Sequence, residues 1–417
     1  MRWMWARRKK SRLPTAYVLV KRKKNWSTAR CIVQYNDFFL SKALKATGRI
    51  LTLLTSEVFN ENTFNCTTVD SLLKQVTDWN QSAEFMHKHL GQHSDVQLHV
   101  HADDLVGFFP SVDQGDMIAC AEYALESFCR TKGRPPHELV ISVPTHAACQ
   151  CFSGKYDGEG SHRPFFLEFL LPFLRYSLEA SVLEYAGDVI RQHRGGPIGS
   201  PCSPPWLILC VCRAEYNWIN SLTPPSSLRG KWWQTSRYVD NRFTVSLAVN
   251  GHIMAPASLF SKTFYGKAVI LEEEEKSRLC GADILKCISR SGAFVLETRY
   301  FVEGYPDVLP QNRALAEELQ WKYRTPSSAS TKSSLMSAFN ARLHLSKRLS
   351  STPERRRQAI CRVCTVYLLL GYRGSWLSSY FFKFAHTHLR DASAEWIRDT
   401  ANALRNGDIV TIHEGGK

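Results

Sequence analysis

The chain has 417 residues, of which 44% are hydrophobic and 12% aromatic, so it can build a large core and is not a disordered protein. Its 53 Lys and Arg residues outnumber its 38 Asp and Glu residues, and the resulting net charge of +15 favours a phosphate-rich partner such as nucleic acid. The apolar runs 206–211 and 366–370 are too short to span a bilayer, and the odd number of irregularly spaced cysteines, 13, argues against a secreted disulfide framework.

The chain begins with a basic segment, residues 1–24, which we predict to be an N-terminal arm. Such an arm serves as a nuclear address or contacts RNA, and the sequence leaves both interpretations open. No apolar core follows the basic run 7–12, so we predict no signal peptide and expect residence inside the cell, with the nucleus as one option. Residues 25–95 contain helical patterns such as Phe38–Leu54 and are expected to form the next folded unit.

Residues Val96–Ala102 alternate apolar and polar side chains, which predicts a half-buried strand. The strand is expected to end in Asp103-Asp104, before the break Gly107–Pro110. A carboxylate at a strand end is suited to hold a divalent cation if a second carboxylate faces it. The alternative is that the two aspartates only cap the following turn. His99 and His101 are expected to lie on the solvent side of this strand.

Gln192–Pro204 is a loop rich in glycine and proline, followed by the start of an apolar helix. Glycines let the backbone approach a nucleotide closely, and prolines stiffen the loop before the helix begins. The loop is not a P-loop, because no Lys-Ser or Lys-Thr follows its last glycine.

Gln234–Tyr238 and Phe243–Leu247 are predicted to be the strands of a hairpin that turns through Asp240-Asn241. Such a turn would direct the Asp240 carboxylate toward a metal ion. Taken alone it favours ordinary Asp-Asn turn chemistry, so its meaning depends on the two preceding segments.

Residues 305–390 are predicted to be helical and carry a basic cluster. The cluster consists of Lys347, Arg348, Arg355, Arg356 and Arg357. It is suited to contact a nucleic-acid backbone, and the alternative is a merely solvated basic face. Cys361 and Cys364 could bind zinc only with the distant His386 and His388, and their helical setting argues against such a site.

The order of Asp104–Phe109, Gly195–Pro204 and Arg237–Asn241 resembles motifs A, B and C of a reverse transcriptase palm, in a form closest to Penelope-like retroelements. Val18–Asn36 and Pro326–Gly374 resemble the fingers hairpin and the thumb of that family. The resemblance implies an α+β right-hand polymerase, whose palm is an antiparallel β-sheet backed by helices and whose thumb is helical. The implied division is an arm at 1–24, fingers at 25–95, a palm at 96–304, a thumb at 305–390 and a tail at 391–417.

The resemblance also implies the activity of a retroelement RNA-directed DNA polymerase, which adds dNTPs to a primer 3′-hydroxyl by two-metal nucleotidyl transfer. Asp104 and Asp240 are the implied ligands of two Mg²⁺ ions, with Mn²⁺ as a substitute. Asn241 stands where the family usually has a second aspartate, and its uncharged amide is expected to weaken metal binding. A catalytically weak or inactive protein that only binds nucleic acid is therefore an alternative.

Further roles carried over by the resemblance concern the nucleotide and the template. Phe109 would lie under the sugar and exclude a 2′-hydroxyl, which argues against the alternative of an RNA-directed RNA polymerase. Other implied nucleotide contacts are Lys23 or Lys24, Arg30, Gln192, Gly199 and Ser200. The expected partners are an RNA template with a DNA primer or an RNA–DNA duplex, along which the basic cluster would lie, and no membrane. Because no GIY-YIG nuclease signature is present, the chain resembles the branch that lacks this endonuclease, a fragment, or a separately encoded polymerase.

Overall fold

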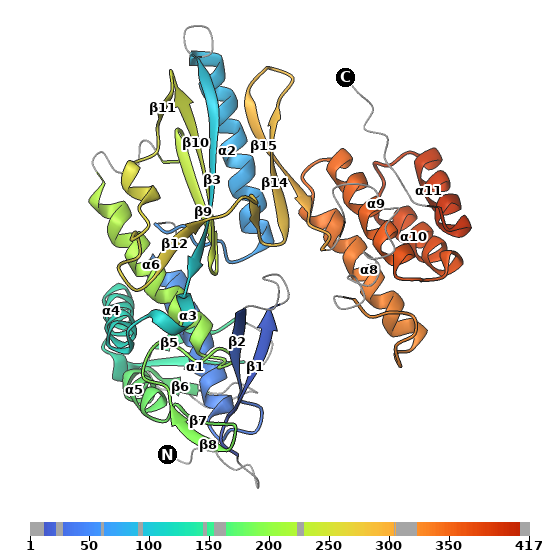
Figure 1. Cartoon of the computed structure of the whole chain (residues 1–417). Helices are drawn as coiled ribbons and strands as arrows, with labels where there is room; N and C mark the ends of the chain where they lie inside the picture. The colour runs from blue at the N-terminus through green and yellow to red at the C-terminus, as the bar shows by residue number, and fades with distance from the viewer. Residues whose placement is uncertain are drawn as a thin grey trace.

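The structure is a computed structural model that describes residues 12–21, 28–59, 62–90, 95–144, 148–153, 164–222, 229–303, 305 and 323–408. Within these ranges the fold is mixed α/β, with four sheets and a separate group of helices near the C-terminus (Figure 1). Within the described ranges, no helix is long and apolar enough to cross a membrane.

A four-stranded sheet joins two distant parts of the chain. Its strands are β1 (Thr15–Lys21), β2 (Thr28–Gln34), β7 (Val182–Tyr185) and β8 (Asp188–Arg191), in the order β2-β1-β7-β8. β1 and β2 form the hairpin expected within Val18–Asn36, with Tyr17 opposite Ile32. The segment 1–24, predicted to be an arm, therefore contains a strand of this sheet, because Thr15–Lys21 pairs with β2 along its whole length.

Helices pack beside this sheet and form one of the two large cores. They are α1 (Ser41–Phe59), α3 (Phe108–Ser111), α4 (Gln114–Lys132), α5 (Leu170–Glu179) and α6 (Ser203–Ser221). A small sheet in the same part of the molecule contains β4 (Leu139–Ser142), β5 (Gln150–Ser153) and β6 (Pro164–Phe166). The stripe of Ile50, Leu51 and Leu54 on α1 is fully buried in this core, which explains the helical period of the sequence there.

The central sheet is antiparallel, as expected. Its strands are β3 (Val96–Val106), β9 (Trp233–Tyr238), β10 (Asn241–Val249), β11 (His252–Ile253) and β12 (Ile270–Glu273). β10 lies between β9 and β3, and β12 pairs with the other edge of β3. The predicted end of β3 at Asp103-Asp104 is wrong, because the ladder with β12 continues β3 to Val106.

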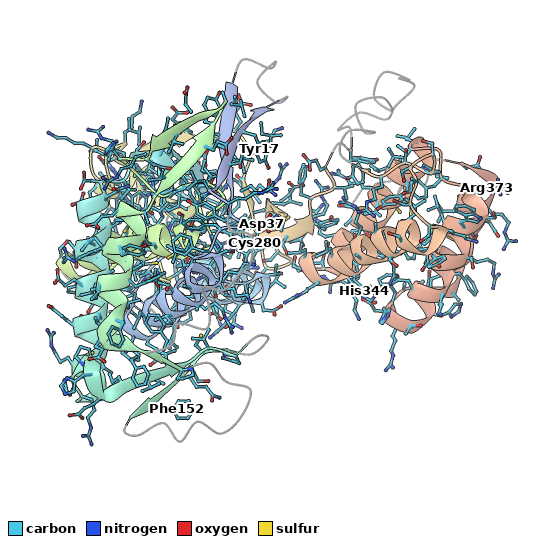
Figure 2. All side chains as sticks on the ribbon, turned by 90° about the horizontal axis from the view of Figure 1, so that it is seen from below. Tyr17, Asp37, Phe152, Cys280, His344 and Arg373 are labelled. Carbon is cyan, nitrogen blue, oxygen red and sulfur yellow. The ribbon has the colours of Figure 1, made fainter. Side chains whose placement is uncertain are left out.

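The C-terminal part begins with a third sheet and continues as a helical unit. The sheet contains β13 (Arg278–Leu279), β14 (Ala282–Ile288) and β15 (Phe294–Tyr300), and it packs with α2 (Val69–Leu90) in the second large core. The helices are α8 (Lys332–Leu349), α9 (Pro353–Leu369), α10 (Gly374–His388) and α11 (Ala394–Asn406). Figure 2 shows this unit, which carries the labelled His344 and Arg373, projecting from one side of the molecule.

The segment 391–417, for which the sequence offered no motif, contains α11. The ring of Trp396 on α11 packs edge-on against Phe381 of α10, with the ring centroids 5.7 Å apart. α11 therefore packs with the helices of this unit, although the segment 391–417 was predicted to be a tail.

A candidate active site at the end of the central sheet

The register of the central sheet brings the backbones of the two candidate metal ligands, Asp104 and Asp240, close together. Asn241, the first residue of β10, pairs with Asp104 of β3. The amide of Leu105 donates a hydrogen bond of 2.8 Å to the carbonyl oxygen of Asp240. Because opposed Cα atoms of an antiparallel pair lie about 4.5–5.5 Å apart, Asp104, Asp240 and Asn241 occupy one small region. All three side chains are partly exposed there.

The turn that carries Asp240 differs from the prediction by one residue. β9 ends at Tyr238 and β10 begins at Asn241, so the turn residues are Val239 and Asp240. Asn241 is in the ladder because it pairs with both Tyr238 and Asp104. Val239 has a positive φ of 57°, a conformation that a β-branched residue rarely adopts. The backbone immediately before Asp240 is therefore strained.

Asp103 and Asp104 point to opposite faces of β3. Asp103 is buried and forms an ion pair of 2.6 Å with Arg242, and His101 Nε2 lies 2.7 Å from its other carboxylate oxygen. Burial alone would raise the pKa of Asp103, but His101 and Arg242 outweigh it and hold this pKa below its usual value. Asp103 therefore interacts with the buried Arg242 and with His101. Asp104 lies on the same face of the sheet as Asn241.

The solvent-side position predicted for His99 and His101 is wrong. Phe260, at the end of the short helix Ala257–Phe260, lies edge-on to both imidazole rings, with centroids 5.8 and 5.1 Å away. The segment that follows the hairpin therefore covers this face of the sheet. The hydrogen bond to Asp103 raises the pKa of His101, whereas burial lowers the pKa of His99.

Asn241 interacts directly with Asp240. Its amide nitrogen donates a hydrogen bond of 2.9 Å to Oδ1 of Asp240. Only the amide oxygen of Asn241 can act as a metal ligand, since its nitrogen is a donor. Asn241 therefore orients the Asp240 carboxylate.

The Gly/Pro loop packs against the segment that follows Asp104. The amide of Gly196 donates a hydrogen bond of 2.9 Å to the carbonyl oxygen of Phe109. The amide of Gly195 donates a hydrogen bond of 2.8 Å to the carbonyl oxygen of Val112. A Cβ at Gly195 would collide with the Phe109 carbonyl, and Gly195 has a positive φ of 63°. Only glycine fits this close approach, which fixes α3 and therefore the backbone of Phe109.

The other end of the same loop contacts the first sheet. The amide of Val33 on β2 donates a hydrogen bond of 2.7 Å to the carbonyl oxygen of Ile198. A Cβ atom at Gly199 would collide with the Val33 carbonyl oxygen. Gly199 has a φ of 113°, so it too requires glycine. The loop therefore links the sheet that carries Arg30 to the helix that carries Phe109.

The remaining predicted nucleotide contacts have varied surroundings. Arg30 is exposed on β2, and Lys23 and Lys24 lie outside the described residues. Ser200 is buried, and its hydroxyl accepts a hydrogen bond of 3.4 Å from the Cys202 amide within the loop. The Gln192 side chain donates 2.7 Å to the Arg194 carbonyl oxygen, so it also stabilises the loop.

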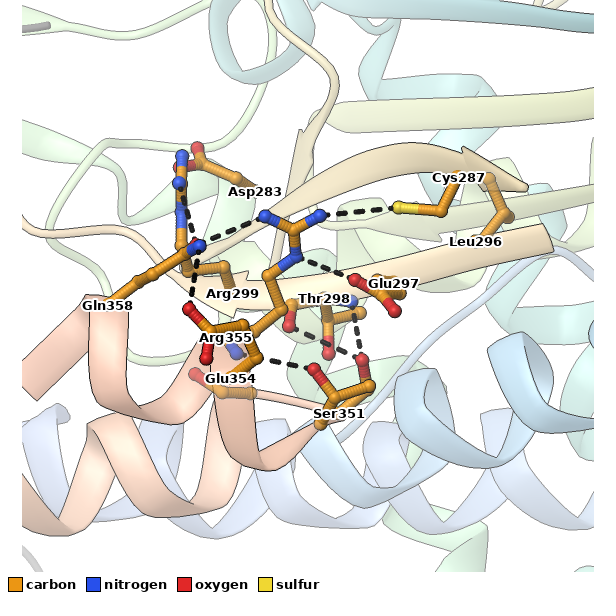
Figure 3. Close-up of polar contacts among 12 residues, drawn as sticks. Asp283, Cys287, Leu296, Glu297, Thr298, Arg299, Ser351, Glu354, Arg355 and Gln358 are labelled. Carbon is orange, nitrogen blue, oxygen red and sulfur yellow. Dashed lines mark hydrogen bonds and ion pairs between the residues drawn. The ribbon is translucent and has the colours of Figure 1, made fainter. Parts of the chain in front are cut away.

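The predicted basic cluster is largely paired with carboxylates of the same chain. Arg348 lies 2.7 Å from Asp70, and Arg355 lies 2.6 Å from Glu297. The other two pairs are Arg356 with Asp391 at 2.6 Å and Arg357 with Glu354 at 2.7 Å. Figure 3 shows Arg355 bridging α9 to β15. Much of the predicted basic face thus has its charge compensated within the fold.

Two features of the site were missed by sequence reasoning. Glu272 on β12 pairs with Asp104 in register, so its side chain lies on the same face of the sheet. Arg237 and Glu215 form a fully buried ion pair behind the turn. The acidic run 272–275 was a sequence signal for Glu272. Nothing in the sequence indicated which acidic residue would form the ion pair with Arg237.

The candidate oxygen ligands at this site are the carboxylates of Asp104 and Asp240 with the amide oxygen of Asn241. Over the described ranges, no group of three or more His, Cys, Asp or Glu side chains is placed to hold a metal ion. Cys361 and Cys364 are buried within α9.

No family model and no curated protein match the chain. Similar solved structures include telomerase from Candida albicans in complex with a TWJ fragment of telomeric RNA, at 10% identity and a TM-score of 0.44, covering 95% of this chain and 66% of that one. Apo telomerase from Candida tropicalis is similar at 8% identity and a TM-score of 0.48, covering 97% and 65%. The chain thus spans about two thirds of the length of these proteins. At such identities and TM-scores the likeness carries no functional argument.

Proposed function

We propose that this chain is an RNA-directed DNA polymerase of the reverse-transcriptase kind, encoded by a Penelope-like retroelement. The observation that supports this most is the register of β3 and β10, which pairs Asn241 with Asp104 and so brings Asp240 beside it. The loop 192–204, which packs on both Phe109 and Val33, adds the third element at the same end of the sheet. The meeting of three segments that are far apart in the sequence supports this proposal.

In this proposal Asp104 and Asp240 hold two Mg²⁺ ions. Carboxylate oxygens of partly exposed residues are the ligands that hard cations prefer, so Asp104 and Asp240 fit the group. When bound, such ions neutralise the triphosphate and activate the primer 3′-hydroxyl. The protein contributes by positioning, since nucleotidyl transfer needs little covalent chemistry from side chains.

Phe109 would select the deoxyribose. Its ring is partly buried and packs edge-on against Phe108, with centroids 5.4 Å apart. Gly196 fixes its backbone, so the ring cannot retreat easily from a nucleotide bound beside Asp104. A 2′-hydroxyl in that position would meet the ring, which favours dNTPs over NTPs.

The proposed partners are an RNA template and a DNA primer. The net charge of +15 suits both strands. A nuclear site of action belongs to the same proposal and rests on the basic start of the chain.

A second function, a nucleic-acid-binding protein without catalysis, is favoured by one observation. Asn241 brings no charge to the site, and its amide nitrogen donates to Asp240. Two carboxylates and one amide hold divalent ions more weakly than three carboxylates do.

One experiment separates the two functions. Extension of a DNA primer on an RNA template is measured with dNTPs or NTPs, in Mg²⁺ and in Mn²⁺. We expect dNTP incorporation that is lost in Asp104→Asn and in Asp240→Asn, while affinity for the primed template is kept. The matched control is Asp116→Asn, an exposed carboxylate on α4. Absence of synthesis by the wild type, or retained synthesis in Asp240→Asn, would refute the polymerase assignment.

A further inference from the structure

A buried polar cluster lies directly behind the turn that carries Asp240. Arg237, the residue before Tyr238 on β9, is fully buried, and so is Glu215 on α6. We propose that Arg237 is a positioning residue, which fixes the Asp240 carboxylate by holding the carbonyl group of Val239. This inference rests on the proposed function, because Asp240 matters only if it binds the catalytic metal.

The three nitrogens of the Arg237 guanidinium make separate contacts, and Nη2 also lies 3.3 Å from Cys212 Sγ. Nε and Nη2 donate to the two carboxylate oxygens of Glu215, a bidentate pair. Nη1 donates to the Val239 carbonyl oxygen at 3.0 Å. Lysine could not reproduce this fork, because an ammonium group lacks the planar arrangement of donors.

Glu215 is itself held from two further directions. The Phe64 amide donates to one carboxylate oxygen at 3.0 Å, and the hydroxyl of Tyr265 donates to the other at 2.7 Å. Glu215 lies on α6, the helix that begins directly after the Gly/Pro loop. The position of Arg237 is therefore set by the helix that also anchors the loop.

Both peptide groups that flank Asp240 are fixed by this arrangement. The carbonyl before it, on Val239, accepts from Arg237, and its own carbonyl accepts from the Leu105 amide at 2.8 Å. Two fixed peptide planes determine the direction of the Cα–Cβ bond of Asp240. Its carboxylate is then placed with respect to Asp104, the neighbour of Leu105 on β3.

The strained φ of Val239 supplies the reason for such a clamp. A positive φ at a β-branched residue persists only where the surroundings over-determine it. Without the bond from Arg237, the Val239 peptide would be able to relax, and the Asp240 side chain would move with it. The ion pair between Arg237 and Glu215 uses Nε and Nη2 and does not require a bond from Nη1. The bond from Nη1 to the Val239 carbonyl is the one that reaches the turn.

The test compares metal binding in four proteins: the wild type, Arg237→Lys, Val239→Gly and the combination of both. Binding of Mn²⁺ alone is measured from the electron paramagnetic resonance signal of the unbound ion, and the double variant Asp104→Asn with Asp240→Asn defines binding elsewhere on the protein. Circular dichroism and thermal unfolding confirm that each variant is folded. The Mg²⁺ concentration for half-maximal primer extension is a second readout.

We expect Arg237→Lys to raise the Mn²⁺ dissociation constant about 10-fold, the lower end of the effect of residues that orient metal ligands. Val239→Gly should bind Mn²⁺ like the wild type, and in combination with Arg237→Lys it should recover part of the loss, because glycine adopts a positive φ without strain. The matched control is Arg229→Lys, since Arg229 lies near Glu215 in the same cluster and donates a hydrogen bond to the Thr63 carbonyl. It should leave Mn²⁺ affinity unchanged even if it lowers stability.

Each outcome decides the proposal. Unchanged Mn²⁺ affinity in folded Arg237→Lys, or an equal loss in Arg229→Lys, would overturn it. If Arg237→Lys alone does not fold, the double variant Arg237→Lys with Val239→Gly is compared with Val239→Gly. Equal Mn²⁺ affinities of these two variants would overturn the proposal. A wild type that binds Mn²⁺ at Asp104 and Asp240 but extends no primer would refute the polymerase function, and the Mn²⁺ affinities of the variants would still decide the clamp.

Discussion

Replacement of Asp103 by leucine should strongly destabilise the central sheet, although Asp103 is not proposed to bind metal. Asp103 and Arg242 are 4% and 1% exposed and are directly opposed on β3 and β10. Arg242 donates to one Asp103 oxygen from Nε at 2.9 Å and from Nη2 at 2.6 Å. Asp103→Leu would leave a buried guanidinium without its counter-charge, and a bond from Nη2 to the Leu259 carbonyl would be its main remaining one.

The expected loss can be estimated in two ways. Two hydrogen bonds between charged groups contribute about 1.5–3 kcal/mol each, which gives a total of about 3–6 kcal/mol. Removal of one partner of a buried ion pair costs about 3–5 kcal/mol. Because whole domains are stable by only about 5–15 kcal/mol, a loss of this size should be easily measured.

The assay is urea unfolding followed by tryptophan fluorescence. The matched variant Asp103→Leu with Arg242→Met removes both charges and should recover most of the loss, since apolar replacement of a buried pair is often neutral. A loss below about 1 kcal/mol in Asp103→Leu would mean that water screens this pair as it screens surface pairs, and would refute the burial argument. In conditions where the variant stays folded it should still extend a primer, unlike Asp104→Asn.

Four further predictions concern the same molecule. The hydrogen bond to Asp103 raises the pKa of His101 in the folded protein. The stability that protonated His101 provides is therefore complete below its unfolded-state pKa of about 6.5 and is lost as the pH rises through the raised pKa. The urea midpoint of the wild type should fall over this pH range, and that of His101→Gln should not. Phe109→Ala should increase NTP incorporation relative to dNTP, and equal use of both by the wild type would contradict the proposed sugar gate. Asn241→Asp should lower the Mg²⁺ concentration for half-maximal activity, because a carboxylate adds charge; an unchanged requirement would show that the amide acts only on Asp240. Neutralising Lys347 should reduce the salt slope of duplex binding by about 0.7–0.9, whereas an unaltered slope would place the duplex elsewhere.

The sequence was sufficient to predict the antiparallel central sheet and the elements that meet at its end. Alternation along Val96–Ala102 and the flanking turn residues are local signals, and the structure has β3 and the β9–β10 hairpin at those positions. The turn was misplaced by one residue, because Asn241 is drawn into the ladder by its pairing with Asp104 across the sheet. Turn propensity is local, whereas register depends on a strand more than one hundred residues away.

The environment of charged residues was predicted less well, for a physical reason. The partners of Arg355 and Arg348 are Glu297 and Asp70, 58 and 278 residues away in sequence. A sequence shows how many charges a segment has, but only the fold determines which of them meet an acid. The basic cluster therefore looked like a continuous surface for nucleic acid.

The pairing of these arginines changes what the helical unit can do. Arg355 ties α9 to Glu297 of β15, and Ser351 strengthens the same junction by donating its backbone amide to the Thr298 carbonyl at 3.0 Å (Figure 3). Within the part of the chain that is described, Lys347 forms no such ion pair and is exposed. A phosphate would have to displace a carboxylate to reach Arg355, but it would meet Lys347 directly. Arg355 therefore acts first as part of the joint between the helical unit and the sheet, and Lys347 is the residue of the cluster that a duplex would meet without displacing a carboxylate.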